Sequence, residues 1–303
     1  MRKVLRFFYN TEFVVGFLIL IITFLLLYLD HPVYSLAVSW FGYALIIDFL
    51  NKKINQHSYF PINQSRFNDL KNIFICALIF CFIIEFFGVY TLRAWYYPHM
   101  SALKYFILAP GAFFIYSFVL LSLYDIIKSK LSFFAPRGRT EDWKKAFYKK
   151  LIKIELILGF IGLATAFFYS LIMVSKFNIA FFDFTKSTNI PFSWWQMFLV
   201  GFSFFFIFEY IAFKQHKETL TKDIVISGNY IPLIAILIAN FIAVVIFEFP
   251  NGPLQIWRFD NWFLNDLRFL NIPLFAFIAW PFQFLIFLPL LRIAFRSKDI
   301  DIW

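Results

Sequence analysis

Residues 72 to 90, NIFICALIFCFIIEFFGVY, decide the class of protein to which this chain belongs. A helix of about 20 apolar residues crosses the hydrocarbon core of a bilayer, and this stretch has that length and composition. Glu85 is its single charged residue. A carboxylate inside such a segment costs roughly 3 kcal/mol, so it normally faces a bundle interior or water. We therefore treat Glu85 as a candidate functional residue.

The composition of the whole chain agrees with a membrane protein. Of its 303 residues, 61% are hydrophobic and 15% are charged, and the mean hydropathy is +0.73. Soluble domains are about half apolar and a quarter charged, so this composition excludes a soluble protein. The net charge of +10 lies in short segments between apolar runs, which indicates membrane topology and no nucleic-acid partner. Cys76 and Cys81 lie on different helix faces, which predicts packing residues.

Eight apolar runs are long enough to span a bilayer. The first begins after a basic segment, as in a signal peptide, but it is long and no small-residue cleavage site follows it, so we expect a membrane span. The predicted spans are Glu12–Leu29, Pro32–Leu50, Asn72–Tyr90, Ala102–Ile127, Leu151–Val174, Trp194–Phe213, Ile231–Phe249 and Ile272–Phe295.

The distribution of basic residues predicts the orientation of these spans. With eight spans, 22 of the 28 lysines and arginines fall on the side of the two termini and 6 on the other side. Because cytoplasmic loops are enriched in Lys and Arg, we expect both termini in the cytoplasm and the protein in the plasma (inner) membrane. In the basic central loop, Thr140 can cap a helix with Trp143 and Phe147 on one face. This helix is predicted to lie on an anionic inner leaflet; the alternative is a solvated basic loop.

Similar residues recur in the same order along the two halves of the chain. The partners are Glu12 and Glu155, Gly42 and Gly201, Glu85 and Glu248, Trp95 and Trp257, and Pro110 and Pro281, at separations of 143, 159, 163, 162 and 171 residues. The fold class predicted from this order is an all-α membrane protein built from two four-span repeats of the same orientation. The repeats cover residues 1–135 and 151–303, with a basic linker at 136–150.

Glu85 and Glu248 occupy equivalent places in these repeats, and aromatic and charged residues follow each of them. One interpretation is an outward-facing pocket in which the two carboxyl groups divide acid and base roles. Its aromatic walls would suit a cation or a polyene. The other interpretation is an interfacial aromatic belt held by Glu85–Arg93 and Glu248–Arg258 ion pairs. The predicted catalytic residues are Glu85 and Glu248, and the predicted substrate-binding residues are Arg93, Trp95, Tyr97, Trp257, Arg258 and Asp260.

The other carboxylates in the spans favour structural roles. Asp48 and Glu209 have lysines beyond them, so we expect snorkelling salt bridges. Glu12 and Glu155 lie at predicted helix N-termini, which a negative charge stabilises. The four histidines are scattered over four loops, and the chain has no phosphate-binding loop, Gly-x-Ser-x-Gly or HExxH motif, so no metal or cofactor is predicted.

The element Glu-x-x-Gly, followed by Trp-x-Tyr or Trp-x-Phe and a span that starts near a proline, resembles integral membrane proteins of carotenoid biosynthesis. These include the small-subunit type of lycopene cyclase and the membrane carotenoid hydratases. The Pro-x-Glu-Glu signature of those cyclases is absent. The residues that carry the resemblance are Glu85, Gly88, Trp95, Tyr97 and Pro98, and again Glu248, Gly252, Trp257, Phe259 and Pro273.

Three functions are compatible with the sequence. The first is an enzyme that acts on a lipophilic, isoprenoid-like substrate by proton transfer, and the resemblance agrees with it. The second is a transporter with a path on the pseudo-two-fold axis, although Asn240 and Gln283 are nearly the only polar residues in mid-span. The third is a structural or assembly subunit, for which the sequence does not name a protein partner. The scarcity of polar groups favours the first, because such a bundle suits a lipid-soluble ligand.

Overall fold

The computed structural model describes residues 2–29, 31–56, 58–59, 67–135, 142–177, 184–186, 194–259 and 262–294. Its long helices are α1 (Arg2–Tyr28), α2 (Pro32–Asn55), α3 (Phe67–Glu85), α4 (Ala102–Leu131), α5 (Asp142–Phe177), α6 (Trp194–Lys214) and α8 (Ile231–Leu254). Shorter elements are the π-helical segment η2 (Phe86–Thr91), the 3-10 turns η3 (Ser132–Phe134) and η4 (Phe284–Ile286), and helices α7 (Leu220–Ser227), α9 (Leu274–Gln283) and α10 (Phe287–Ala294). The strands are β1 (Trp95–Tyr96), β2 (Arg258–Phe259), β3 (Arg268–Phe269) and β4 (Ile272–Pro273).

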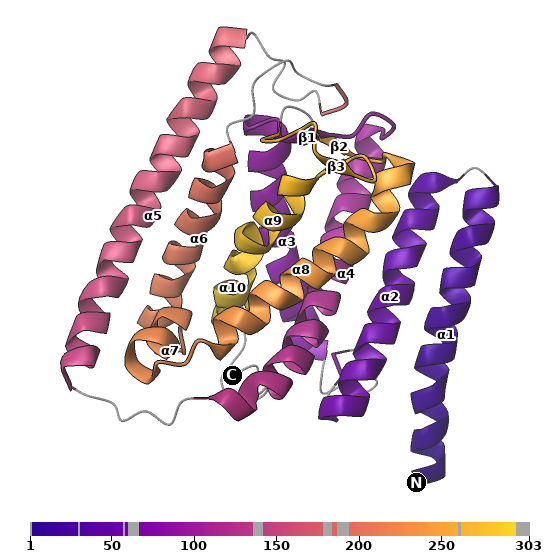
Figure 1. The fold of residues 1–303 in the computed structure, drawn as a ribbon, viewed down its shortest axis with the longest axis horizontal. Coiled ribbons are helices and arrows are strands. Elements are labelled where there is room, and N and C mark those ends of the chain that lie inside the picture. Colours follow the sequence, from indigo (N-terminus) through magenta and orange to yellow (C-terminus); the bar gives the residue numbers. More distant parts are fainter. Residues whose placement is uncertain are drawn as a thin grey trace.

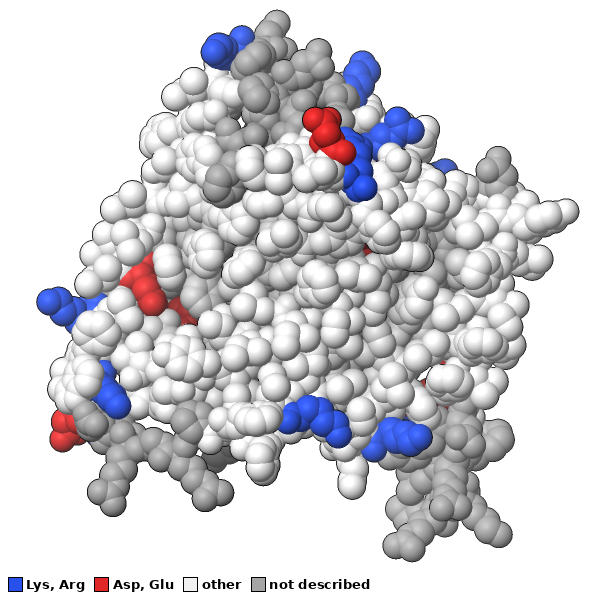
Figure 2. Space-filling view, viewed as in Figure 1, with Lys and Arg blue, Asp and Glu red and all other residues white. Residues whose placement is uncertain are grey.

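Within the described residues, eight helical stretches are long and apolar enough to cross a membrane, which confirms the predicted number of spans. Their order in space is simple (Figure 1): α1 and α2 form one end of the bundle, α5 and α6 form the other, and α3, α4, α8, α9 and α10 lie between them. The centre of the face in Figure 2 is almost free of charged side chains, as lipid contact requires. The protein is therefore a polytopic membrane protein.

Small residues allow close packing within each of the two outer helix pairs, α1 with α2 and α5 with α6. A Cβ atom on Gly16 of α1 would lie 3.0 Å from the carbonyl oxygen of Gly42 on α2, and one on Gly159 of α5 would lie 2.9 Å from that of Ser203 on α6. Such close backbone approach is how helices associate in lipid, where burial of apolar surface gives little driving force. The outer pairs thus pack tightly, and the central helices are left to form the core.

Two spans near the candidate site differ from the predicted ones. The helix of the seventh span continues through Pro250 to Leu254, whereas we expected Pro250 to end it. Pro250 cannot donate a backbone hydrogen bond, and it lies four residues before the end of α8, so little of the helix follows it. The eighth span begins at Leu274 and is divided into α9, η4 and α10, because Pro281 interrupts the hydrogen-bond ladder.

The expected helix of the central loop begins at Asp142 and runs without a break into the fifth span, as one helix, α5. The proposed cap, Thr140, lies outside the described residues. Trp143 and Phe147 are 63% and 49% exposed, as expected for side chains that face lipid. The lysine-rich start is therefore continuous with the helix of the fifth span and does not form a separate helix.

Asp48 and Glu209 lie at the end of the bundle where α1 begins. Each binds the chain that follows its own helix, whereas we expected each to bind a lysine. Asp48 accepts hydrogen bonds from the Ser58 hydroxyl and from the backbone N–H of Tyr59 (2.8 Å). Glu209 accepts from the backbone N–H groups of Leu220 (3.1 Å) and Thr221 (2.8 Å) at the start of α7, a helix that we did not predict. The two carboxylates therefore fix the loops that follow α2 and α6.

Candidate functional site

Glu85 ends α3 in the core of the bundle, near the strands. Its side chain accepts hydrogen bonds from the hydroxyl groups of Tyr97 (2.8 Å) and Tyr105 (2.9 Å), and the residue is 6% exposed. Tyr97 follows β1, and Tyr105 is in the first turn of α4. Burial, and then the neighbouring Glu85, raise the pKa of Tyr97 well above its ordinary value, so this phenol keeps its proton and donates it.

A change of helix type after Glu85 turns the chain back over the site. The π-helical segment η2 replaces the end of the α-helix, as is common at functional sites. The chain then reverses through Arg93, whose φ is 53°. Gly88 makes this possible, because a Cβ atom there would collide with the ring of Trp95. Trp95 is thus laid directly over the last turn of the third span.

Strands β1 and β2 join the two segments that sequence analysis singled out. They are antiparallel, with Trp95 opposite Phe259 and Tyr96 opposite Arg258. The indole N–H of Trp262 also donates to the carbonyl oxygen of Ala94 (2.5 Å). Residues separated by more than 160 positions therefore form one cover over the end of the bundle.

A cavity of about 350 Å³ lies beneath this cover, at the small end of the range for small-molecule sites. Of the described residues that line it, Glu85 alone carries a carboxyl group. Eight aromatic side chains surround the cavity, and the centroids of neighbouring rings are 4.7 to 6.4 Å from each other. The exception is the pair Tyr97 and Trp95, which are two residues apart in the sequence. We call these eight side chains the aromatic ring: Trp40, Trp257, Tyr97, Trp95, Trp280, Phe284, Tyr116 and Phe247.

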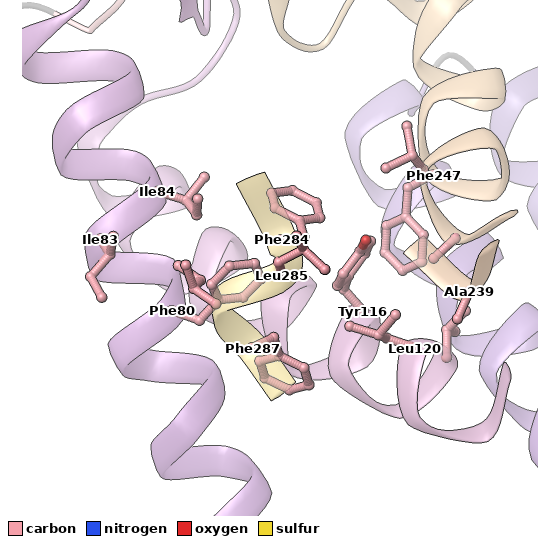
Figure 3. Close-up of a cluster of buried hydrophobic side chains, with 14 of the residues drawn as sticks. Phe80, Ile83, Ile84, Tyr116, Leu120, Ala239, Phe247, Phe284, Leu285 and Phe287 are labelled. Atoms are coloured by element: carbon pink, nitrogen blue, oxygen red, sulfur yellow. The ribbon is translucent and has the colours of Figure 1, made fainter. Parts of the chain in front are cut away.

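The floor of the cavity is a closely packed layer of aromatic side chains. Tyr116 lies between Phe284 and Phe247, with Phe80 and Phe287 beyond Phe284 (Figure 3). The Tyr116 hydroxyl donates to Oδ1 of Asn240 (3.2 Å), and Nδ2 of Asn240 donates to the carbonyl oxygen of Pro281 (3.3 Å). Asn240 thus ties α4, α8 and α9 together and satisfies the backbone where the eighth span is interrupted.

One wall of the cavity reaches the lipid-facing surface between α2 and α4. Ile107 is 62% exposed, Val33 and Ala37 are partly exposed, and a Cβ atom on Gly111 would meet nothing within 4 Å. Near the strands, Lys104 of α4 places its Nζ 5.7 Å from the ring centroid of Tyr34 on α2. The cavity is therefore open to the side of the bundle, where a molecule dissolved in the bilayer would meet it.

Glu248 has different surroundings from Glu85. It is 1% exposed, and it accepts hydrogen bonds from Nε1 of Trp257 (3.2 Å) and from Nδ2 of Asn251 (3.4 Å). Nδ2 of Asn251 also donates to the carbonyl oxygen of Trp257 (3.1 Å), and Oδ1 of Asn251 accepts from the backbone N–H of Trp257 (3.2 Å). Glu248 is not among the lining residues. It holds Trp257 in the wall rather than facing the cavity.

The structure brings together half of the predicted site residues. Glu85, Trp95, Tyr97 and Trp257 line the cavity. Arg93 is buried outside the cavity wall, Arg258 is exposed, and Asp260 lies outside the described residues. In place of the arginines of the alternative interpretation, Tyr97 and Tyr105 donate hydrogen bonds to Glu85, and Trp257 donates one to Glu248.

Sequence reasoning missed Tyr105 and five members of the aromatic ring. Tyr105 follows Glu85 by 20 residues, and no local pattern relates the two. Trp40 and Trp280 carried a usable signal, because tryptophan is rare in mid-span and favours membrane interfaces. The other missed members are Tyr116, Phe247 and Phe284, which are indistinguishable in sequence from the many other aromatic residues of the spans.

Comparison with protein-family models, with curated proteins and with solved structures finds no match for this chain. Within the described ranges, no three His, Cys, Asp or Glu side chains gather closely enough to hold a metal ion. The groups that the described residues place at the cavity are one carboxyl group, its two tyrosine donors and the aromatic ring.

Proposed function

We propose that the protein is a membrane enzyme that takes an isoprenoid-like lipid from the bilayer and transfers protons to and from it, with Glu85 as the acid and base. The observation that supports this most is the carboxyl group of Glu85 in the wall of an aromatic cavity that is open toward lipid. Apolar walls suit a lipophilic substrate, and a single convergent acid gives it a reaction. The resemblance to carotenoid-biosynthesis proteins agrees with a polyene or another unsaturated chain.

The proposed reaction is a proton transfer without net oxidation. Protonated Glu85 gives its proton to one carbon of a C=C bond, and the π electrons form the new C–H bond and leave a carbocation at the other carbon. The carboxylate then removes a proton from a carbon next to the cation, and those C–H electrons form a shifted double bond. Alternatively, the π electrons of a second C=C bond first form a ring bond to the cation, and the carboxylate removes the proton from a carbon next to the new cationic carbon. Tyr97 and Tyr105 stabilise the carboxylate between the two steps through their hydroxyl groups.

The aromatic ring would stabilise the cation. Indole faces attract positive charge strongly when water is excluded, and four tryptophans belong to the ring: Trp40, Trp95, Trp257 and Trp280. In this proposal Glu248 does not share the acid and base roles. It acts as a positioning residue, because its contact with the site runs through Nε1 of Trp257.

A transport path along the pseudo-two-fold axis is less well supported. The layer below the cavity is packed, and Phe80 and Phe287 there are fully buried. The mid-span Asn240 is used to tie helices together. A purely structural subunit would not need a carboxyl group in an apolar cavity, where it is costly.

We also propose the tandem four-span repeat. Its support is that equivalent residues have equivalent contacts: Asp48 binds the N–H of Tyr59 and Glu209 that of Leu220, each 11 residues further along. The register of β1 and β2 is centred on Tyr96 and Arg258, as a two-fold axis between repeats would require. The outer pairs α1–α2 and α5–α6 lie at opposite ends of the bundle (Figure 1).

The proposed orientation places both termini in the cytoplasm of a plasma (inner) membrane, with the basic start of α5 against anionic lipid. Helix α1 begins and α10 ends at the same end of the bundle (Figure 1), in agreement with the bias of basic residues. Reporter fusions at each terminus, one active in the cytoplasm and one outside it, test this. Activity of the external reporter at either terminus would overturn it.

Lipid and pigment mass spectrometry on membranes from cells that carry the protein tests the enzyme. Membranes with the wild type, Glu85→Gln and Glu248→Gln are compared at equal protein levels. We expect a lipid species that depends on Glu85 and accumulates to a lesser extent with Glu248→Gln. Identical profiles for wild type and Glu85→Gln would overturn the proposal and favour a transport or assembly role.

A further inference from the structure

A lysine lies at the edge of the opening through which the cavity meets lipid. Lys104 shares a helix face with Ile107 and Leu108 of the cavity wall, because residues three and four positions apart are neighbours on a helix. On the other side of the opening, Tyr34 follows Val33 of the cavity wall on α2. The Nζ atom of Lys104 lies 5.7 Å from the ring centroid of Tyr34. The lysine therefore reaches across the opening and places its positive charge where a lipid would enter.

The charge of Lys104 is available to a ligand. The side chain is exposed, and within the described residues no carboxylate forms an ion pair with it. Its contact with Tyr34 is a cation–π contact, which is weak at an exposed site. By contrast, Arg268 donates to the backbone carbonyl oxygens of Asn265 (2.8 Å) and Asn271 (3.1 Å), so its donors are already used. An anion at the opening would meet an ammonium group that keeps its N–H donors.

The cavity extends from the level of this lysine to the aromatic floor. Tyr105, the next residue of α4, donates to Glu85 (2.9 Å), so Lys104 and the acid belong to the same turn of the bundle. Tyr116 of the floor lies 11 residues after Tyr105, which corresponds to about 16 Å along the helix. A lipid whose polar end is held at Lys104 can therefore lay its chain along the whole cavity.

We propose that the lipid taken into this cavity carries an anionic head group, such as a phosphate ester, and that Nζ of Lys104 binds this group at the opening between α2 and α4. The apolar chain then occupies the cavity between Glu85 and the floor. The inference rests on the proposed function, and it narrows the substrate class from isoprenoid-like lipids in general to those with an anionic head group.

The test is a binding measurement with two probes that differ only in the head group. Full-length protein in phosphatidylcholine nanodiscs is equilibrated with farnesyl phosphate or with farnesol, and bound ligand is measured by mass spectrometry after removal of free ligand. Empty nanodiscs correct for the partition of each probe into lipid. We expect the wild type to prefer the phosphate by about tenfold, the value of one hydrogen bond to a charged group. Equal affinity for the two probes would overturn the inference.

Variants assign the preference to the lysine. Lys104→Gln removes the charge and should bring the two affinities to within about twofold of each other, whereas Lys104→Arg keeps the charge and should keep the preference. Lys176→Gln is the matched control, because Lys176 is exposed in the last turn of α5, a helix that ends near the strands but far from α2 and α4 (Figure 1). A preference that persists in Lys104→Gln, or that Lys176→Gln also loses, would overturn the inference.

A further variant tests whether the chain of the probe enters the cavity. Gly111→Phe narrows the opening and leaves Lys104 in place, since a Cβ atom on Gly111 points into open space. We expect this variant to bind farnesyl phosphate about tenfold more weakly than the wild type. Unchanged affinity would show that the phosphate is adsorbed outside the cavity, and would overturn the inference.

A competitor distinguishes an isoprenoid phosphate from a phospholipid of the bilayer, which offers the same head-group chemistry. Dioleoylphosphatidic acid is included in the nanodiscs at the concentration of farnesyl phosphate. We expect the bound farnesyl phosphate to fall by less than twofold, because two acyl chains do not fit the cavity. Its displacement would overturn the inference, since the lysine would then serve the phospholipids of the membrane.

Failure of this inference can be distinguished from failure of the proposed function. Glu85→Gln removes the acid but leaves Lys104 in place, so it should still prefer the phosphate. If lipid profiles do not depend on Glu85 while the preference is present and depends on Lys104, the protein binds anionic lipids without converting them. If profiles depend on Glu85 but both probes bind equally, the enzyme stands and its substrate needs no charged head group.

Discussion

Glu85 and Glu248 follow the same kind of apolar run and precede the same kind of aromatic segment, yet they are used differently. Glu85 faces the cavity and is bound by two tyrosine hydroxyl groups. Glu248 is bound by Trp257 and Asn251 behind the wall. The difference comes from the residues that follow, since Tyr97 occupies in one segment the place that Phe259 occupies in the other. Of the two, only Glu85 presents its carboxyl group to the cavity, whereas Glu248 binds a side chain of the wall.

The comparison teaches that two similar sequence elements need not give two similar sites. The segment after Glu85 closes over the bundle with Trp95 packed on Gly88, whereas Gly252, which follows Glu248, packs against the backbone of Leu270. A side chain can be displaced more easily than a backbone, so the packing around Gly88 can adjust more readily than the packing around Gly252. Each prediction below tests one part of this division.

The largest difference is expected between the two carboxyl groups themselves. Glu85→Gln keeps the size of the side chain but removes the acid, so conversion of the substrate should fall by about 100-fold or more. Glu248→Gln keeps an acceptor for Trp257 and should cost much less. The measurement is the rate of product formation in membranes with equal protein levels. Equal losses in the two variants would show that both carboxyl groups react, and the comparison would fail.

Access from lipid should matter almost as much. Gly111→Phe places a large side chain in the open space between α2 and α4, and it should weaken substrate binding about tenfold or more. Leu103→Phe is the matched control, because Leu103 is 73% exposed on the same helix outside the cavity wall. Substrate affinity is measured for both variants. An equal loss of affinity in the two would indicate a general effect on α4 rather than a blocked entrance.

Substitutions of Gly88 and Gly252 test the Glu85 segment and the Glu248 segment separately. Gly88→Ala pushes the ring of Trp95 toward the cavity and should reduce conversion more than it reduces thermal stability. Gly252→Ala meets the backbone of Leu270 and should lower the stability by about 1–3 kcal/mol, the usual effect of overpacking. Melting temperature and conversion rate are measured on the same preparations. The reverse pattern would assign the supporting role to the Glu85 segment.

The smallest expected effects concern the tyrosine hydroxyl groups. Tyr97→Phe and Tyr105→Phe each remove one hydrogen bond to Glu85, which corresponds to about 1 kcal/mol, or roughly fivefold in rate. Tyr116→Phe is the control, because its hydroxyl binds Asn240 rather than Glu85. It should lower stability with little effect on the acid step. A larger rate loss for Tyr116→Phe would move the reacting group toward the cavity floor.

The sequence predicted the features that depend on composition and local order. Hydropathy alone located the spans, because a bilayer demands long apolar helices. The grouping of Glu85 with Trp95, Tyr97 and Trp257 followed from aromatic residues that recur after an acidic one. Arg93 and Arg258, which were predicted to bind substrate, do not line the cavity. Charge alone does not reveal whether a side chain faces a cavity, protein or water.

Other features depend on contacts between distant helices. The rings of Trp40 and Tyr116 belong to the site only because α2, α4 and α8 meet there. The π-helical turn after Glu85 arises from the packing of Trp95 on Gly88, not from the propensity of residues 86–91. Helix α7 is short and depends on Glu209 to bind its first N–H groups, so its own sequence gives little sign of it.

The pairing of β1 with β2 also determines when, during synthesis of the chain, the cavity can form. A ribosome completes Trp95 long before it completes Phe259, and Trp280 and Phe284 come later still. Until the last span has been inserted, the cavity around Glu85 is incomplete. A chain interrupted before that point contains Glu85 but lacks Trp280 and Phe284 of the cavity wall. The cavity of the newly made protein is thus completed at one late moment, when its final helices reach the membrane.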